Sequence, residues 1–249
     1  MRILGLDLGS RRTKAVLLED RNIATTAIFE SWLLSKDDIL QWVRTVSYDS
    51  CVCTGYSRRL AAENLGGKII TEISAFASGA AILAPESETI IDIGGQDAKV
   101  IKREKNGSVA DFEMNDRCAA GTGKFFEISA KTLGKSYDEF IEAAFSSEEL
   151  QTITSICAVF AESEIIGKLA EGISGNSIAR GIFHSVAQRI LTMIKRLSGK
   201  PPFILVGGGA NRALSRELEK LLGEKVDLPP NASYFGAAGA ALSGLKKHK

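Results

Sequence analysis

The chain has 249 residues, of which 45% are hydrophobic and 24% charged, and its formal net charge at pH 7 is +1. This composition is typical of a folded protein with enough apolar material for one large or two ordinary domains, and the near-neutral charge without a basic, aromatic-rich stripe argues against nucleic-acid and membrane-surface partners. No apolar run approaches the roughly 18 residues of a membrane span, and the N-terminus carries an early aspartate instead of a signal peptide, so we expect a cytoplasmic protein.

The first predicted element is a β-hairpin in "LDLGSRRTKAVLLE", residues 6–19. A strand of branched apolar residues ends near Asp7, Gly9 makes a tight turn, and a second strand follows; "NIATTAIFES" (22–31) is expected as a third strand. A glycine turn lets backbone N–H groups approach an anion, and the aspartate can hold a cation or its waters nearby. A single turn of this kind is more often an ordinary hairpin than a phosphate site.

Helix and strand signals alternate after the first hairpin. "SKDDILQWVRTV" (35–46) predicts a helix that starts on a cap at Ser35. "SCVCTGYS" (50–57) and "KIITEIS" (68–74) both predict strands.

A second hairpin, "IDIGGQDAKVIKRE" (91–104), repeats the first without a gap, so that Asp7 aligns with Asp92 and Lys14 with Lys99. The duplication favours a phosphate-binding site over two ordinary hairpins, because two glycine turns that face each other would bind a polyphosphate and its Mg²⁺. The repeat therefore predicts an α/β protein built from two tandem, hairpin-led units.

The third strand expected after the second hairpin, "SVADFEMN" (108–115), leads into "CAAGTGKFF" (118–126). "GTGK" is similar to the end of a P-loop, which needs a glycine six residues before its lysine and Ser or Thr directly after it. Here Cys118 stands six residues before Lys124, and Phe125 follows the lysine. The segment is therefore not a P-loop, and phosphate-binding turns are expected elsewhere in the chain.

Two elements are predicted in the C-terminal half. "SIARGIFHSVAQRILTMIKRL" (177–197) has apolar residues at helical spacing, so His184 within it is predicted to be a structural helix residue and not a ligand. "PFILVGGGANRALSRELEKLL" (202–222) predicts a strand, three glycines and a helix, without the glycine spacing of the dinucleotide fingerprint. This unit suits a nucleoside that lies against bare backbone at a helix N-terminus.

The four cysteines of the chain are expected to be reduced thiols. Cys51 and Cys53 are predicted to face opposite sides of a sheet and to serve as packing residues. For Cys118 and Cys157, the residues alone leave buried packing and a functional role equally open.

The order of two DxG hairpins and a strand, GGG and helix unit resembles the phosphate-1, phosphate-2 and adenosine motifs of the superfamily of actin, sugar kinases and Hsp70 ATPase domains. Within it, the chain is most similar to the ATP-dependent activators of 2-hydroxyacyl-CoA dehydratases and the ATPase subunits of benzoyl-CoA reductases. The segments that carry the resemblance are "GLDLGSRRTKAVLL", "TGYSR", "EISAFASGA", "IIDIGGQDAKVI", "MNDRCAAGTGKFFE", "CAVFAESEII", "VGGGANR" and "YFGAAGAAL". The cysteine-containing pair is the specific part, since the ATP motifs fit any member of the superfamily.

The resemblance implies a fold class: α/β, with two tandem ribonuclease H-like subdomains of the actin-type ATPase and a nucleotide cleft between them. We expect the first subdomain at residues 1–84 and the second, with the cluster cysteines, at 85–249. In this arrangement the C-terminal helix can pack back on the first subdomain.

The resemblance also implies ligands for a metal cluster. Cys118 and Cys157 would be the two ligands that each chain gives to one [4Fe–4S] cluster on the two-fold axis of a homodimer. Four thiolates suit such a cluster, and two from each partner supply them by symmetry. Asp7 and Asp92 are expected to act through Mg²⁺, with water between the ion and the protein.

The expected nucleotide site combines the three glycine motifs. Its predicted binding residues are Gly9, Ser10, Arg11, Arg12, Lys14, Gly94, Gly95, Gln96, Gly207, Gly208, Gly209 and Asn211. Gln96 and Asp97 are predicted to be catalytic, because a Gln or Asp beside a γ-phosphate can orient or deprotonate water. The equal alternative is that Gln96 satisfies turn backbone and Asp97 pairs with a neighbouring lysine. Arg11 and Arg12 depart from the small hydroxyl residues usual in the family, which leaves hydroxyl contacts there in doubt.

The implied function is ATP hydrolysis that drives one-electron transfer. A ferredoxin or flavodoxin would reduce the cluster, and the electron would pass at low potential to a 2-hydroxyacyl-CoA dehydratase or related acyl-CoA reductase. One alternative is a small-molecule kinase of the same superfamily. Another is a non-catalytic ATP-binding module bridged by Zn²⁺, since four sulfur ligands also suit zinc.

Overall fold

The computed structural model describes residues 1–115, 122–154 and 158–245. Within them the chain divides into two compact units. The first unit comprises residues 1–90, 101–112 and 230–249, and the second comprises 91–100 and 113–229.

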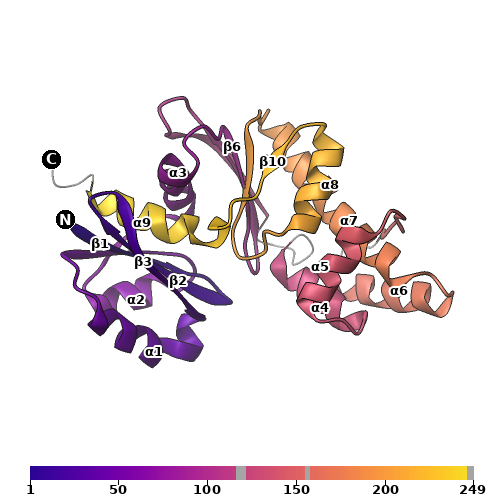
Figure 1. Ribbon diagram of the computed structural model, residues 1–249, viewed down its shortest axis with the longest axis horizontal. Helices are drawn as coiled ribbons and strands as arrows, with labels where there is room; N and C mark the ends of the chain where they lie inside the picture. Colours follow the sequence, from indigo (N-terminus) through magenta and orange to yellow (C-terminus); the bar gives the residue numbers. More distant parts are fainter. Residues whose placement is uncertain (116–121, 155–157, 246–249) are drawn as a thin grey trace. The chain divides into compact units, whose positions relative to one another are not determined.

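A five-stranded sheet forms the centre of the first unit (Figure 1), with the strand order β3-β2-β1-β4-β5. Its strands are β1 Arg2–Leu8, β2 Arg12–Glu19, β3 Asn22–Glu30, β4 Ser50–Thr54 and β5 Lys68–Ile69. β1, β2 and β3 pair antiparallel, whereas β4 runs parallel to β1, and β5 parallel to β4. The sheet is therefore a hairpin meander extended by parallel strands.

The second sheet repeats this order as β10-β9-β6-β7-β8. Its strands are β6 Thr89–Ile93, β7 Ala98–Arg103, β8 Val109–Asn115, β9 Phe203–Val206 and β10 Val226–Asp227. In both sheets the first hairpin strand lies in the middle, with the rest of its meander on one side and the later strands on the other. The predicted duplication and both predicted third strands are confirmed.

Burial explains why the central strands are continuous apolar runs. In β1 every residue from Ile3 to Leu8 is buried, and in β2 every residue from Thr13 to Leu18. Strands covered on both faces need side chains that suit a core on each face, whereas the edge strand β3 alternates between more and less exposed positions.

The described helices follow the predicted alternation. They are α1 Trp32–Thr45, α2 Arg58–Leu65, α3 Glu72–Leu83, α4 Gly123–Thr132, α5 Tyr137–Ser146, α6 Ala158–Ala170, α7 Gly175–Arg196, α8 Arg212–Leu222 and α9 Phe235–Leu245. The Phe183 ring of α7 lies 4.4 Å from the Phe126 ring of α4 and 4.9 Å from the Phe140 ring of α5. This aromatic cluster fixes α4 and α5 against α7 in the second unit.

Two predicted boundaries in the first unit were wrong. α1 begins at Trp32, and Ser35 lies inside it at non-helical backbone angles, with its hydroxyl donating to the Glu30 and Ser31 carbonyls instead of capping the helix. The predicted strand 68–74 is limited to β5, because Thr71 accepts a hydrogen bond from the Ser74 N–H and starts α3.

The prediction that Cys51 and Cys53 face opposite sides of the sheet was also wrong. Their Sγ atoms lie 3.9 Å apart, because side chains alternate along a strand and residues two apart share a face. Both are buried in the core of the first unit, as expected for packing residues. The hydrogen bond with Cys51 and burial raise the pKa of the Cys53 thiol, which keeps it protonated and unreactive.

Helix α9 packs closely on β1 and α3 because glycines remove side chains from the contacts. A methyl group on Gly5 would overlap the Ala237 carbonyl oxygen, and one on Gly79 would lie 2.9 Å from the Phe235 carbonyl carbon. Gly239 of α9 faces Ala75 and Gly79 in the same way. The C-terminal helix is therefore part of the core of the first unit.

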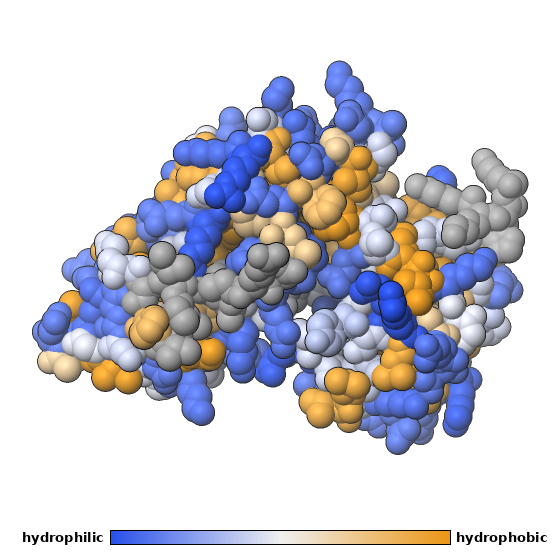
Figure 2. All heavy atoms as spheres, turned by 180° about the vertical axis from the view of Figure 1, so that it is seen from behind, coloured by the Kyte–Doolittle hydropathy of each residue, from blue (hydrophilic) through white to orange (hydrophobic). Residues whose placement is uncertain are grey.

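Hydrophilic residues predominate on the face shown in Figure 2, with smaller hydrophobic groups between them. Within the part of the chain that the structure describes, no helix is long and apolar enough to cross a membrane.

Candidate functional site

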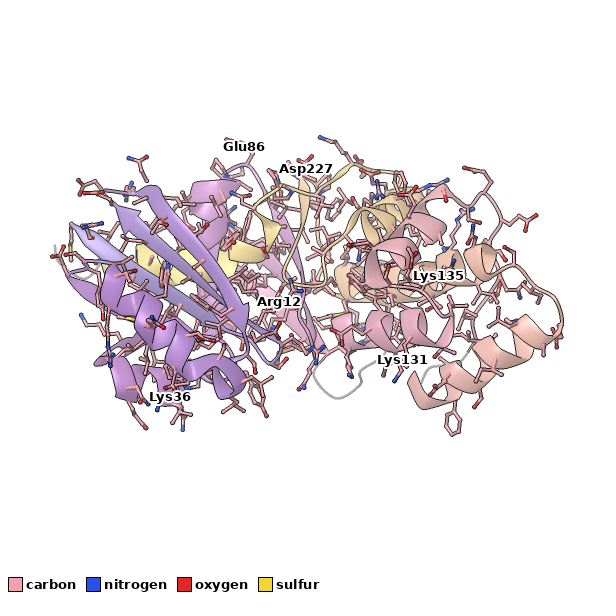
Figure 3. All side chains as sticks on the ribbon, turned by 60° about the horizontal axis from the view of Figure 1, so that its bottom comes forward. Arg12, Lys36, Glu86, Lys131, Lys135 and Asp227 are labelled. Atoms are coloured by element: carbon pink, nitrogen blue, oxygen red, sulfur yellow. The ribbon has the colours of Figure 1, made fainter. Side chains whose placement is uncertain are left out.

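The turn between β1 and β2 brings an acidic and a basic residue together in the first unit. Asp7 and Lys14 are opposite each other in the strand register, both are buried, and Lys14 Nζ lies 3.5 Å from Asp7 Oδ2. Gly9 and Ser10 form the turn, and the exposed Arg12 begins β2 opposite Glu30 (Figure 3). The predicted residues of this motif therefore lie together.

Two glycines outside the hairpin lie close to the end of β1 that carries Asp7. Gly55, with φ +92°, follows β4, and a methyl group there would lie 2.6 Å from the Leu8 N atom. A methyl group on Gly236 of α9 would lie 3.0 Å from the Asp7 carboxylate. The "TGYSR" segment and the start of α9 thus pack against the carboxyl end of β1, at Asp7.

The second hairpin has the same pair with an additional carboxylate. Lys99 Nζ lies 3.2 Å from Asp92 Oδ2 and 2.7 Å from Asp97 Oδ2, and Asp92 and Lys99 are almost fully buried. Asp97 folds back over Gly94, where a methyl group would overlap its carboxylate. Gln96 is exposed at the tip. This ion pair between Asp97 and Lys99 is the alternative to a catalytic role that the sequence left open for Asp97.

The three glycines after β9 lie against the end of β6 in the second unit. Gly209 N donates to the Ile93 carbonyl at 2.8 Å, and Gly207, at φ +95°, faces Asp92 so closely that a side chain would overlap the carboxylate. Gly208 is exposed. The second hairpin and the GGG segment, both predicted to bind nucleotide, therefore meet at Asp92.

Asn211 has a structural role next to these glycines. Its Oδ1 accepts a hydrogen bond from Leu214 N at 3.1 Å and caps α8, while its Nδ2 donates to the Gly209 carbonyl at 2.9 Å. These two hydrogen bonds use one donor and one acceptor site of the Asn211 amide to order the GGG segment and the start of α8.

A buried ion network ties α8 to α7. Glu217 of α8 accepts from Arg180 Nε at 2.9 Å and lies 3.0 Å from His184 Nδ1. His184 thus has a structural role in a helix, as predicted. The network fixes the helix that follows the GGG segment.

Sequence reasoning missed that Gly123 and Lys124 contact the turn of the second hairpin. At the start of α4, Gly123 N donates to the Gly94 carbonyl and Lys124 N to the Gly95 carbonyl, both at 2.9 Å. A methyl group on Gly123 would lie 3.2 Å from the Gly94 oxygen and 3.8 Å from the Gly209 Cα atom. The "GTGK" segment therefore ends between the second hairpin turn and the GGG segment, although its spacing excludes a P-loop.

Cys118 and Cys157 lie outside the described residues. Helix α4 begins at Gly123 and α6 at Ala158, so a helix follows each cysteine in the chain. In the ranges 1–115, 122–154 and 158–245, no three His, Cys, Asp or Glu side chains group as metal ligands. The cluster ligands and the magnesium site remain predictions.

A model of the BadF/BadG/BcrA/BcrD ATPase family matches residues 4–244. The chain belongs to this family. The resemblance stated from the sequence is thereby confirmed, and so is the expected class of protein, an ATPase.

Named relatives of this BadF/BadG/BcrA/BcrD ATPase extend over nearly the whole chain. The activator of lactoyl-CoA dehydratase from Anaerotignum propionicum is 38% identical, over 97% of this chain and 96% of the relative. The (R)-2-hydroxyglutaryl-CoA dehydratase activating ATPase of Acidaminococcus fermentans is 36% identical, over 98% and 97%. A solved structure of the activator of the 2-hydroxyisocaproyl-CoA dehydratase from Clostridium difficile with bound ADPNP has a TM-score of 0.91 at 35% identity, covering 99% of this chain and 95% of that one. The predicted fold class, with two α/β subdomains of actin type, is confirmed.

Proposed function

We propose that the chain is an ATP-hydrolysing one-electron activator, which passes a low-potential electron from a homodimer-bridging [4Fe–4S] cluster to a 2-hydroxyacyl-CoA dehydratase or a related acyl-CoA reductase. The observation that carries the proposal is that the second hairpin turn, the GGG segment and Gly123 pack against one another in the second unit of an ATPase of this family. The names of its relatives support the choice of partner, because they are dehydratase activators.

The glycine turns would bind the phosphates of ATP through their backbone. Gly9 and Ser10 in the first unit, and Gly95 in the second, are at least partly accessible and have little or no side chain to keep an anion away from their N–H groups. The Gly94 N–H donates to the Asp97 carbonyl at 2.8 Å, so Gly94 would contribute by closing the turn. Exposed Gly208 offers bare backbone to the nucleoside.

The residues present fit a magnesium ion that is held through water. When bound, Mg²⁺ supplies positive charge that neutralises the phosphates. Asp7 and Asp92 would hold it, because both carboxylates stand at strand ends beside the glycine turns. One oxygen of each already faces a lysine, at 3.5 Å and 3.2 Å, which favours contact through water over direct ligation.

Gln96 and Asp97 are the proposed groups that act on the attacking water. Gln96 is exposed at the tip of the turn, where its amide can orient water. The Asp97 carboxylate is held over the turn by Lys99, with one oxygen 2.7 Å from Nζ. Its other oxygen, Oδ1, lies over Gly94 at the turn and would be the one to accept a proton from water.

Cys118 and Cys157 would hold the cluster, which when bound takes one electron from a ferredoxin or flavodoxin and gives it to the acceptor enzyme. Two thiolates from each of two chains make the four sulfur ligands that such a cluster needs. Cys51 and Cys53 do not compete for it, since both are buried in the core of the first unit.

The test is ATP-dependent oxidation of the reduced protein. After anaerobic purification and chemical reduction, the protein should hydrolyse ATP and lose one electron per cluster to an added 2-hydroxyacyl-CoA dehydratase, and neither should occur without Mg²⁺. Transfer of phosphate to sugars or acyl acids in place of electron transfer would favour the kinase alternative and contradict the proposal.

A further inference from the structure

The two hairpins are chemically unequal at the places where phosphates are proposed to bind. In the first, one carboxylate and one ammonium, Asp7 and Lys14, balance each other, and two arginines follow at the tip. In the second, Lys99 is shared by Asp92 and Asp97, so these three groups carry a net charge of −1. A polyphosphate at the second turn would meet a negative cluster without an arginine at the tip.

Helix α4 brings one more lysine to this turn. The backbone N–H of Lys124 donates to the Gly95 carbonyl at 2.9 Å, which places the start of its side chain directly beside the turn. Its neighbour Gly123 lies between Gly94 and Gly209. Lys124 therefore stands where the phosphate turn and the GGG segment meet in the second unit.

The side chain of Lys124 is held only loosely. It is 45% exposed, and Nζ lies 3.7 Å from Oε2 of Glu127, one turn further along the helix. A surface pair of this kind contributes at most about 1 kcal/mol, and the four-carbon stem of lysine is flexible. Lys14 and Lys99, by contrast, are buried in their ion pairs. Lys124 can thus leave Glu127 for a stronger anion at little cost.

We propose that Lys124 binds the β- and γ-phosphates at the second hairpin turn and makes the site selective for nucleoside triphosphates over monophosphates. The inference rests on the proposed nucleotide site. A lysine reaches the phosphates in P-loops through sequence spacing; here the docking of α4 on the turn brings it there. An ammonium group bound to phosphate forms charge-assisted hydrogen bonds, which are stronger than those between neutral groups.

The experiment measures binding of AMP, ADP and a non-hydrolysable ATP analogue by titration calorimetry. Lys124→Met and Lys124→Gln should weaken binding of the ATP analogue about tenfold or more, which is about 1.4 kcal/mol, should weaken ADP less, and should leave AMP unchanged. Lys124→Arg should keep most of the affinity, because the charge remains. The matched control is Lys131→Met, an exposed lysine near the other end of α4 (Figure 3).

Two results would overturn the inference. One is wild-type affinity for the ATP analogue in both neutral variants; the other is an equal loss for AMP and ATP, which would indicate a general distortion of α4. Failure of the proposed function looks different: Gly208→Val would then bind the analogue like the wild type, or the wild type itself would not bind it.

Discussion

Asp7 and Asp92 end equivalent strands and each faces a lysine, yet Asp92 and Lys99 share their cluster with a second carboxylate. We expect Asp7→Asn and Asp92→Asn each to lower Mg²⁺-dependent ATP hydrolysis by about tenfold or more, because a neutral amide holds the hydrated ion less strongly. The rate of phosphate release checks this. Asp227→Asn, at an exposed position on β10, is the control. Wild-type rates in both hairpin variants would contradict the paired-hairpin site.

The second prediction at the residue scale separates chemistry from binding at the tip of the second turn. Gln96→Ala and Asp97→Ala should bind ATP but hydrolyse it at least about tenfold more slowly, a barrier increase of about 1.4 kcal/mol. Single-turnover hydrolysis and nucleotide titration measure the two steps. Because Asp97 pairs with Lys99, a lower melting temperature with an unchanged hydrolysis rate would show that its role is only structural.

At the scale of elements, the packing of α9 depends on a glycine that faces α3. Gly239→Ala should lower the free energy of unfolding by about 1–3 kcal/mol or more, because the added methyl group would lie 2.5 Å from the Gly79 N atom and backbone cannot easily give way. Gly167→Ala in α6 is the matched control. A methyl group there has no heavy atom within 4 Å, so it should stabilise the helix slightly. Denaturant unfolding compares them, and equal stabilities would contradict the close packing.

The elements that could be predicted from the sequence are those with a local pattern. The hairpins follow from apolar strands around glycine turns, and the duplicated motif predicted the repeated strand order. Start and end positions were less accurate, as at Ser35, because a buried hydroxyl bonded to nearby carbonyls and did not cap the helix. The contact of Gly123 and Lys124 with the second turn could not be predicted, since it joins segments far apart in sequence through backbone hydrogen bonds.

For the whole molecule, the proposed cluster joins two chains, so each cysteine should matter to both iron binding and association. Cys118→Ser or Cys157→Ser should abolish iron binding, because either change removes two of the four ligands from the symmetric site. Nucleotide affinity should persist, since the glycine turns are formed without these residues. Sedimentation with and without iron tests the dimer. A wild-type protein that is monomeric when loaded with iron would contradict the bridging arrangement.

The most direct test of the central proposal is the metal content of the protein purified without oxygen. A [4Fe–4S] cluster shared by two chains predicts about two iron and two acid-labile sulfide per chain, in a dimer, with the iron lost in the Cys118→Ser variant. Zinc at about one ion per two chains without sulfide would instead indicate a Cys₄ zinc bridge. That result, or a dimer with neither metal, would contradict the assignment of this ATPase as an electron-transferring activator.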